Sequence, residues 1–112
     1  MELYNYRATI IKVHDGDTVT ARIDLGFDVS VTETFRLARI NAPEVVGASK
    51  TRGLESRDYL RQQLLNCLVD LTTQKDRREK YGRYLAEIYY LGSNTNVNDE
   101  MVSKGFAEYQ DY

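Results

Sequence analysis

Apolar and polar positions alternate along the first part of the chain, and this pattern predicts extended strands. Residues 7–14 are rich in β-branched side chains and end at Asp15-Gly16, a pair that favours a tight turn. Over residues 17–24 the apolar positions share one face of the expected strand with Asp17. The first two strands are therefore expected to form a hairpin that carries a carboxylate at the start of its second strand, on the apolar face.

A third strand is expected over residues 29–40, with a bend or bulge near 32–34, where the alternation shifts phase. Pro43 ends this strand. From about 52 to 66 the period becomes helical, and a fourth strand is expected over 68–73.

A charged loop over residues 74–80 is expected to lead into a fifth strand over 83–90. A short helix follows, for which Asn98 is the expected N-cap and Gly105 the C-terminal stop. Five strands with two helices predict an α+β, mainly β, domain on the strand plan of an OB-type five-stranded barrel.

Composition narrows the class of protein. A chain of 112 residues with 42% hydrophobic and 29% charged residues is expected to be one folded domain over 1–112. Cys67 has no second cysteine to pair with, so a free, buried thiol is expected. Neither a secretory leader nor a membrane-spanning stretch is visible, which predicts a cytoplasmic protein without a membrane partner, and a monomer is expected. The net charge of −2 argues mildly against a polyanionic partner, although a bound cation would offset it.

Three short motifs rich in chemically versatile residues follow one another along the chain. They are Asp15-Gly16-Asp17-Thr18, then Phe35-Arg36-Leu37 leading to Asn41-Ala42-Pro43-Glu44, then Lys80-Tyr81-Gly82-Arg83. Each alone also fits an ordinary turn or a solvated strand end. Together they supply carboxylates and separated arginines, the groups that hold a hard cation against a phosphodiester.

The oxygen-bearing residues suggest a cation site with a proton acceptor beside it. Asp17 can ligate a hard divalent cation, with Asp15 supporting it. Asn41 can add its amide oxygen and Ala42 its backbone carbonyl. Glu44 can accept a proton from a water molecule as a general base.

The cationic residues suggest a phosphate clamp. Arginine binds phosphate through two parallel hydrogen bonds and stays charged, which suits Arg36 and Arg83. Lys80 and Tyr81 can contact a terminal phosphate, and some of the nine tyrosines can stack on bases of single strands. His14 precedes a turn at a strand end, and a non-catalytic role is expected for it.

From about residue 7 to residue 107 the chain resembles a staphylococcal-nuclease-type domain. The matching blocks are residues 11–19, 34–37, 41–44, 80–86 and 97–107. The resemblance implies an OB-type barrel with flanking helices and calcium-dependent hydrolysis of phosphodiester bonds in DNA and RNA. It also implies that Asp17 ligates Ca²⁺, that Arg36 and Arg83 bind phosphate, and that Glu44 is the proposed base.

Three departures from the family pattern bear on activity. The best-known member has aspartate where this chain has Asn41, so one ligand charge is missing, and affinity for calcium depends on ligand charge. Alanine replaces threonine at Ala42, and the usual extended C-terminal helix is expected to be absent. The sequence therefore predicts a calcium-dependent nuclease with weak sequence preference, acting on single-stranded or flexible DNA and RNA. The alternatives are a weakly active or inactive nucleic-acid- or protein-binding module, or a structural domain of a larger assembly.

Overall fold

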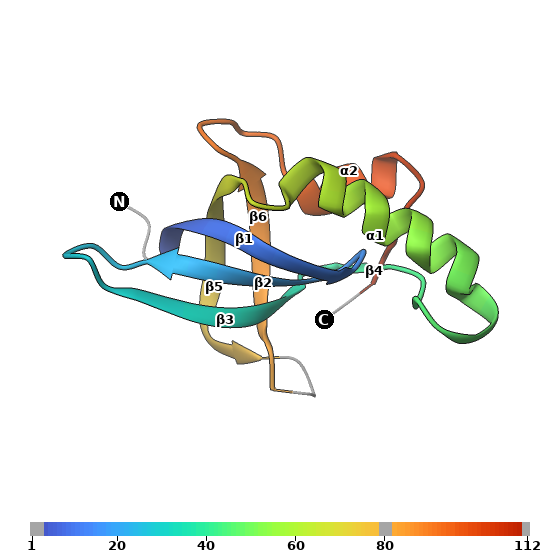
Figure 1. Ribbon diagram of the computed structural model, residues 1–112, viewed down its shortest axis with the longest axis horizontal. Helices are drawn as coiled ribbons and strands as arrows, with labels where there is room; N and C mark the ends of the chain where they lie inside the picture. The colour runs from blue at the N-terminus through green and yellow to red at the C-terminus, as the bar shows by residue number, and fades with distance from the viewer. Residues whose placement is uncertain (1–3, 79–81, 111–112) are drawn as a thin grey trace.

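A closed five-stranded barrel forms the body of the molecule (Figure 1). The strand pattern predicts the five strands, and the family resemblance implies their closure into a barrel. The computed structural model describes residues 4–78 and 82–110, with the backbone alone over 74–78. The barrel strands, in the order in which they are hydrogen-bonded, are β1 (Asn5–Asp15), β2 (Thr18–Asp24), β3 (Ser30–Leu37), β6 (Tyr84–Tyr90) and β5 (Leu68–Arg78). Together with the two helices this confirms the α+β class and the OB-type plan.

The first three strands form the expected antiparallel meander, and β3 then closes the barrel by pairing in parallel with β6 over Phe35–Leu37. The predicted irregularity near 32–34 is wrong, because the β2–β3 register is continuous from Thr18 to Asp24. The register shifts lie in β1, between Ile10 and Lys12 and between Val13 and Asp15. Residues 30–33 are all exposed to solvent. Apolar and polar residues do not alternate there because neither face of the strand is buried, and no bulge is present.

The third strand ends earlier than expected, at Leu37. Arg39 takes a left-handed conformation with φ of 69°, and the chain turns into a two-residue strand, β4 (Ile40–Asn41). This strand pairs with β7 (Glu108–Tyr109). Two-residue pairings between distant segments leave no periodic pattern, which is why neither strand was predicted.

Helix α1 (Lys50–Leu64) packs against β1 and covers one end of the barrel (Figure 1). A short 3₁₀ turn, η1 (Gly47–Ser49), comes directly before it. The helix begins two residues before the predicted start and ends two residues before the predicted end. Its buried face is unusual in carrying small residues, Gly53 and Ser56, in its first half and leucines in its second. The small half therefore brings the backbone of α1 close to the segments beneath it.

Helix α2 (Val97–Ser103) is capped by Asn96, not by Asn98 as predicted. The Asn96 side chain accepts a hydrogen bond from the Asp99 amide at 2.9 Å. Asn98 is fully buried: it donates to the carbonyls of Ala38 and Ala86 and accepts from the Ile88 amide, and so fastens α2 to the barrel. Gly105, at φ of 82°, follows the helix as predicted.

Two further expectations fail around β5. The segment predicted as a charged loop from residue 74 continues the strand as far as Arg78, which pairs with Tyr84. Charged residues can occupy a strand wherever a partner strand supplies its backbone groups. Cys67 is a free cysteine as expected but lies exposed, because it sits in the turn between α1 and β5 rather than on the buried face of the helix.

The core fills the barrel and the space beneath the helices. Its largest fully buried side chains are Ile10, Val19, Leu37, Ile40, Leu60, Leu64, Val69, Leu71, Ile88, Val97 and Met101. The far end of the β2–β3 hairpin is different, because Phe27 is fully exposed at its tip. Within the described residues, no helix is long and apolar enough to cross a bilayer.

Candidate active site

Asp17 sits in the tight turn that joins β1 to β2, at the end of the barrel beneath α1. Its amide donates to the carboxylate of Asp15 at 3.0 Å, so the first carboxylate of the motif shapes the turn that presents the second. Although it precedes the first residue of β2, Asp17 is only 6% exposed. The inward placement predicted from the alternation is thus present.

The carboxylate of Asp17 is held from three sides. One oxygen, Oδ2, lies 3.0 Å from Nη1 of Arg36 and accepts the backbone amide of Ala42 at 2.8 Å. The other, Oδ1, accepts the Thr18 hydroxyl at 3.1 Å. These contacts join three segments of the chain at one carboxylate.

Burial is the largest influence on the protonation of Asp17, and it raises the pKa of this carboxyl to about 7. The neighbouring Asp15 raises the pKa further, whereas the charge of Arg36 and the amide of Ala42 act in the opposite direction. Two carboxylates close together in a buried site disfavour ionisation, and an added cation would relieve that cost.

Arg36 is the second buried charge, with 5% of its surface exposed. Its neighbours in β3, Phe35 and Leu37, are buried as well, so both faces of this strand end are covered. Its Nη2 donates to Oδ1 of Asn41 at 3.2 Å, and Nη1 reaches the Leu37 carbonyl at 3.4 Å. From the sequence, Arg36 could also be an ordinary surface residue of a strand. The structure places it in the interior instead.

Arg83 reaches the same network from the start of β6. Its Nη1 donates to the hydroxyl oxygen of Thr18 at 3.2 Å, and Thr18 in turn donates to Asp17. Thr18 therefore links Arg83 to the carboxylate that Arg36 contacts directly. Sequence reasoning missed this role of Thr18, although its place directly after Asp17 in a strand paired with β3 at Arg36 was the available signal.

The Asn41–Glu44 segment follows β4 and passes beside the turn that holds Asp17. Ala42 is buried and bonded to Asp17 through its amide, and Asn41 meets Arg36. The side chain of Glu44 is exposed, and no hydrogen bond among the described residues joins it to Asp17 or Arg36. The structure thus gathers Asp17, Arg36, Asn41, Ala42 and Arg83, and leaves Glu44 at the edge, two residues from Ala42.

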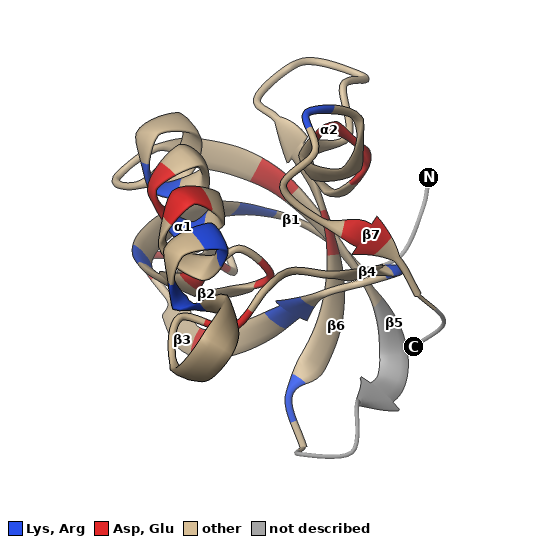
Figure 2. Ribbon diagram, turned by 90° about the vertical axis from the view of Figure 1, so that its right-hand side faces the viewer, with Lys and Arg blue, Asp and Glu red and all other residues tan. Residues whose placement is uncertain are grey.

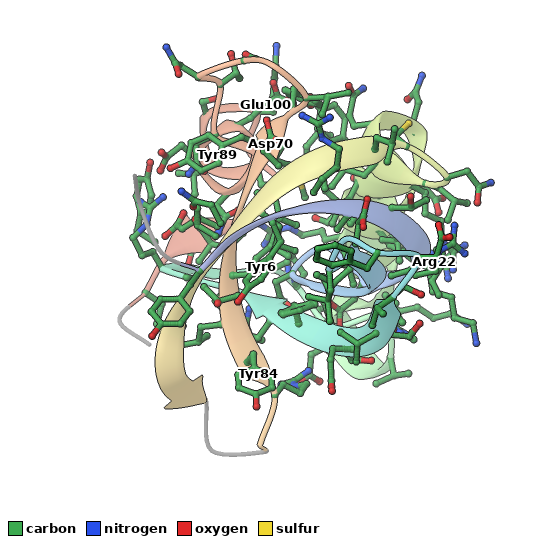
Figure 3. The ribbon with its side chains drawn as sticks, turned by 90° about the vertical axis from the view of Figure 1, so that its left-hand side faces the viewer. Tyr6, Arg22, Asp70, Tyr84, Tyr89 and Glu100 are labelled. Carbon is green, nitrogen blue, oxygen red and sulfur yellow. The ribbon has the colours of Figure 1, made fainter. Side chains whose placement is uncertain are left out.

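The remaining predicted residues are His14, Lys80, Tyr81 and the tyrosines proposed for base stacking. Lys80 and Tyr81 fall outside the described residues. His14 is exposed, and its Nε2 lies 2.8 Å from the Thr20 hydroxyl. Among the tyrosines, Tyr84 lies at the start of β6, and its ring packs against that of Phe35. In Figure 3 it lies at the opposite end of the molecule from Glu100.

Two of the remaining tyrosines serve the interior rather than a binding surface. Tyr59 stacks on Phe106, and the hydroxyls of Tyr59 and Tyr90 both donate to Glu100. Burial, with Glu100 beside them, raises the pKa of Tyr59 to about 12 and that of Tyr90 as well, so both phenols stay protonated and keep donating. These rings fasten α1 to α2 and β6.

The oxygens around Arg36 are of the type that a hard cation prefers. Asp17 and Asn41 both bond to its guanidinium, so a carboxylate and an amide oxygen converge on one cationic group. No cluster of three or more His, Cys, Asp or Glu side chains suited to a metal occurs among the side chains described, those of residues 4–73 and 82–110. The donor set fits calcium in kind, but with the low charge that the neutral Asn41 imposes.

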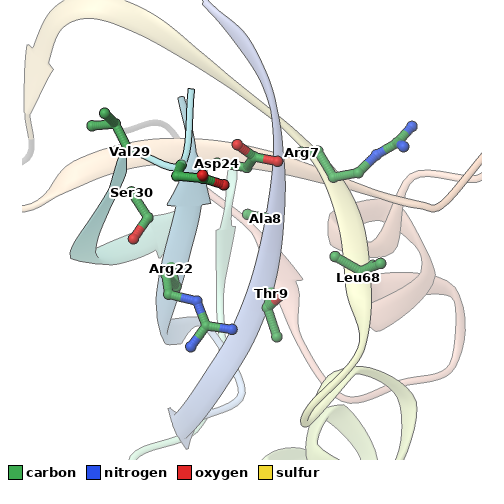
Figure 4. A pocket seen from close by; sticks show the side chains of 9 residues that line it. Arg7, Ala8, Thr9, Arg22, Asp24, Val29, Ser30 and Leu68 are labelled. Atoms are coloured by element: carbon green, nitrogen blue, oxygen red, sulfur yellow. The ribbon is translucent and has the colours of Figure 1, made fainter. Parts of the chain in front are cut away.

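One hollow in the surface lies away from this network. A hollow of about 270 Å³ lies at the other end of the β1–β2 hairpin, lined by Arg7, Arg22 and Asp24 among others, and contains none of the candidate site residues (Figure 4). Acidic residues mark α2 and β7, whereas α1 mixes both signs (Figure 2). None of the described buried polar residues lines this hollow, so the Asp17–Arg36 network is the stronger candidate site.

Comparison of the sequence with known proteins identifies the family of the chain. The model of the staphylococcal nuclease homologue family matches residues 34–112. A thermonuclease of Staphylococcus hyicus is 28% identical over 106 residues, covering 92% of this chain and 59% of the relative. An uncharacterized endonuclease of Haemophilus influenzae is 35% identical over 104 residues, covering 88% and 49%. The chain spans about half the length of these curated relatives. Because the family model covers well over half of the chain, the protein belongs to the staphylococcal nuclease homologue family.

Proposed function

We propose that this protein is a calcium-dependent nuclease that hydrolyses phosphodiester bonds of DNA and RNA with weak sequence preference. The observation that carries the proposal is the connected network of Asp17, Arg36, Asn41 and, through Thr18, Arg83. Family membership and the printed names of two relatives, a thermonuclease and an endonuclease, support it.

The arginines bind the phosphate in this mechanism. Arg36 and Arg83 approach the Asp17–Thr18 corner from β3 and β6, so together they can contact oxygens of one phosphate group. Both remain charged while negative charge accumulates on the phosphate oxygens, and so they stabilise the transition state more than the ground state. Glu44, exposed at the edge of the site, accepts a proton from the attacking water or orients that water.

A calcium ion would be held by Asp17, Asn41 and the carbonyl of Ala42. Bound there, it supplies charge neutralisation and polarises the phosphate. Single-stranded or flexible substrates are favoured, because a strand must bend its phosphate toward buried groups.

Cleavage of a labelled single-stranded oligonucleotide in calcium, in magnesium and in chelator tests the proposal. We expect calcium-dependent cleavage that Glu44→Gln lowers by about 10²–10⁴-fold, since a general base contributes on that scale. Arg83→Ala should lower it by about 100-fold. Glu55→Gln is the matched control, because Glu55 is an exposed glutamate of α1 outside the network. Folded protein without cleavage in millimolar calcium, or cleavage indifferent to Glu44→Gln, would refute the assignment.

Two observations favour a second candidate function, a binding module without turnover. Asn41 removes a charge from the ligand set, and Arg36 is already engaged by Asp17. This alternative predicts oligonucleotide binding that is equally tight in calcium and in chelator, with no product formed. Calcium-stimulated binding together with cleavage would exclude it.

A further inference from the structure

The backbone of Glu44 lies directly against helix α1 at Gly53. A Cβ atom placed on Gly53 would stand 2.0 Å from the Glu44 carbonyl oxygen and 2.4 Å from its carbonyl carbon. It would also stand 2.8 Å from the amide nitrogen of Val45. These are backbone atoms, which cannot swing aside as the end of a flexible side chain can. The absence of a side chain at Gly53 is therefore a condition for the observed course of the loop.

Glycine at this place is not explained by the helix itself. Gly53 lies within the first half of α1, and glycine is among the poorest helix formers in a helix interior. It is buried, so no solvent-facing role accounts for it either. The close passage of the Glu44 backbone is the feature that requires glycine here.

Two further contacts hold the loop that follows β4, over residues 42–49. A Cβ on Gly16 would lie 2.8 Å from Cβ of Ala42 and 2.8 Å from Cβ of Ser56, so the Asp17 turn packs closely on both the loop and the helix. The Ser49 hydroxyl donates to the Glu44 carbonyl at 3.2 Å. The backbone around Glu44 is thus held on both sides, although no hydrogen bond or ion pair within the described residues fixes its side chain.

We propose that Gly53 is a positioning residue for Glu44: by letting the loop backbone approach α1, it sets where the carboxylate stands relative to the Asp17–Arg36 network. The inference rests on the proposed nuclease function. A misplacement of about 1 Å can cost a reaction about 100-fold, so a single methyl group at residue 53 is enough to matter.

The test compares Gly53→Ala with Glu55→Ala, an exposed position of the same helix, in the single-strand cleavage assay. We expect Gly53→Ala to lower kcat by about 10- to 100-fold with KM within about twofold. In a Glu44→Gln background, Gly53→Ala should cause no further loss of kcat, because it acts through Glu44. An unchanged kcat, or an equal further loss in that background, would overturn the proposal.

A second readout does not depend on activity. Amide chemical shifts should change over residues 44–49 and the start of α1 in Gly53→Ala, and stay unchanged in the barrel strands. This result would support the displacement even if the wild-type protein cleaved nothing, which would contradict the proposed function alone. Shifts confined to α1, with residues 44–49 unaffected, would overturn the proposal. Ser49→Ala decides the matter if Gly53→Ala does not fold: a smaller fall in kcat at unchanged KM supports the role, and no fall contradicts it.

Discussion

Arg36 and Arg39 are close together in the chain and both form ion pairs with carboxylates, but one pair is buried and the other is exposed to solvent. Arg36 meets Asp17 through one contact of 3.0 Å, with side chains only 6% and 8% exposed. Arg39 holds Glu87 with two hydrogen bonds of 2.7 and 2.8 Å and Asp99 with a third of 2.8 Å, with side chains 43%, 24% and 45% exposed. The exposed cluster has the better hydrogen-bond geometry.

Burial, rather than geometry, decides what each pair does. Water competes with the exposed ions and screens them, so the Arg39 cluster adds little stability beyond joining the β3–β4 turn to β6 and α2. In the interior, loss of one partner leaves the other charge without water, so the Asp17–Arg36 pair is costly to break. A buried pair of this kind adds little net stability but concentrates charge in a low-dielectric site, which is consistent with the proposed binding of a phosphate.

Breaking the buried pair should have the largest effect. Arg36→Ala leaves Asp17 buried beside Asp15 without its cationic partner, and we expect the free energy of unfolding to fall by about 3–5 kcal/mol at a pH well above the pKa of Asp17 in the intact pair, which is about 7. At lower pH the loss should be smaller, because Asp17 then takes up a proton. Urea denaturation measures it. Arg22→Ala, at an exposed arginine of β2, should change it by less than about 0.5 kcal/mol. A loss below about 1 kcal/mol for Arg36→Ala would mean that the pair is more hydrated than its burial indicates.

Removing the exposed cluster should have a smaller effect. Arg39→Ala deletes the contacts to Glu87 and Asp99, and we expect a loss of about 1 kcal/mol that shrinks in about 1 M NaCl because the ions are screened. Cleavage activity should be unchanged. A loss comparable to that of Arg36→Ala, insensitive to salt, would erase the distinction between the two arginines.

The smallest effect is expected from acid. Arg39, followed by the Tyr109 hydroxyl, lowers the pKa of Asp99 below its ordinary value of 3.8. Ionised Asp99 therefore stabilises the fold above pH 3.8, and this contribution is lost as the pH falls through the lower folded-state pKa. The difference in melting temperature between wild type and Asp99→Asn should be present at about pH 6 and vanish below that folded-state value. A difference that grows on acidification would contradict the assignment.

Local patterns predicted the elements better than the contacts between them. The alternation that ends near Ile23 predicts the β1–β2 hairpin, and the helical period that includes Leu64 predicts α1. Both predictions succeed because these elements depend on residues that are close together in the chain. The expected N-cap, Asn98, is wrong and Asn96 caps α2, since both are asparagines near the helix start and only packing separates a cap from a buried anchor. The burial expected for Cys67 is wrong, because α1 ends at Leu64, two residues before the predicted end, and Cys67 therefore lies in the exposed turn that follows.

The site shows the same division. Asp17 could be placed inward from its phase in the strand, whereas the burial of Arg36 could not, because the cover comes from β4 and the loop after it. Thr18 was overlooked, since its link to Arg83 depends on a strand far along the chain. Gly53 carries no recognisable motif, and only the backbone passing over it shows why glycine stands there.

The parallel pairing of β3 with β6 has a consequence for how the protein reaches its native state. Phe35 pairs with Tyr84, and Leu37 with Ala86, so the barrel closes through contacts that are remote in sequence and entropically expensive to form early. The meander can assemble locally and bring Arg36 beside Asp17, but Arg83 joins them only when β6 docks. A partly folded chain would thus bring together Arg36 and Asp17 without Arg83, and the proposed site would be complete only at the closing step of folding.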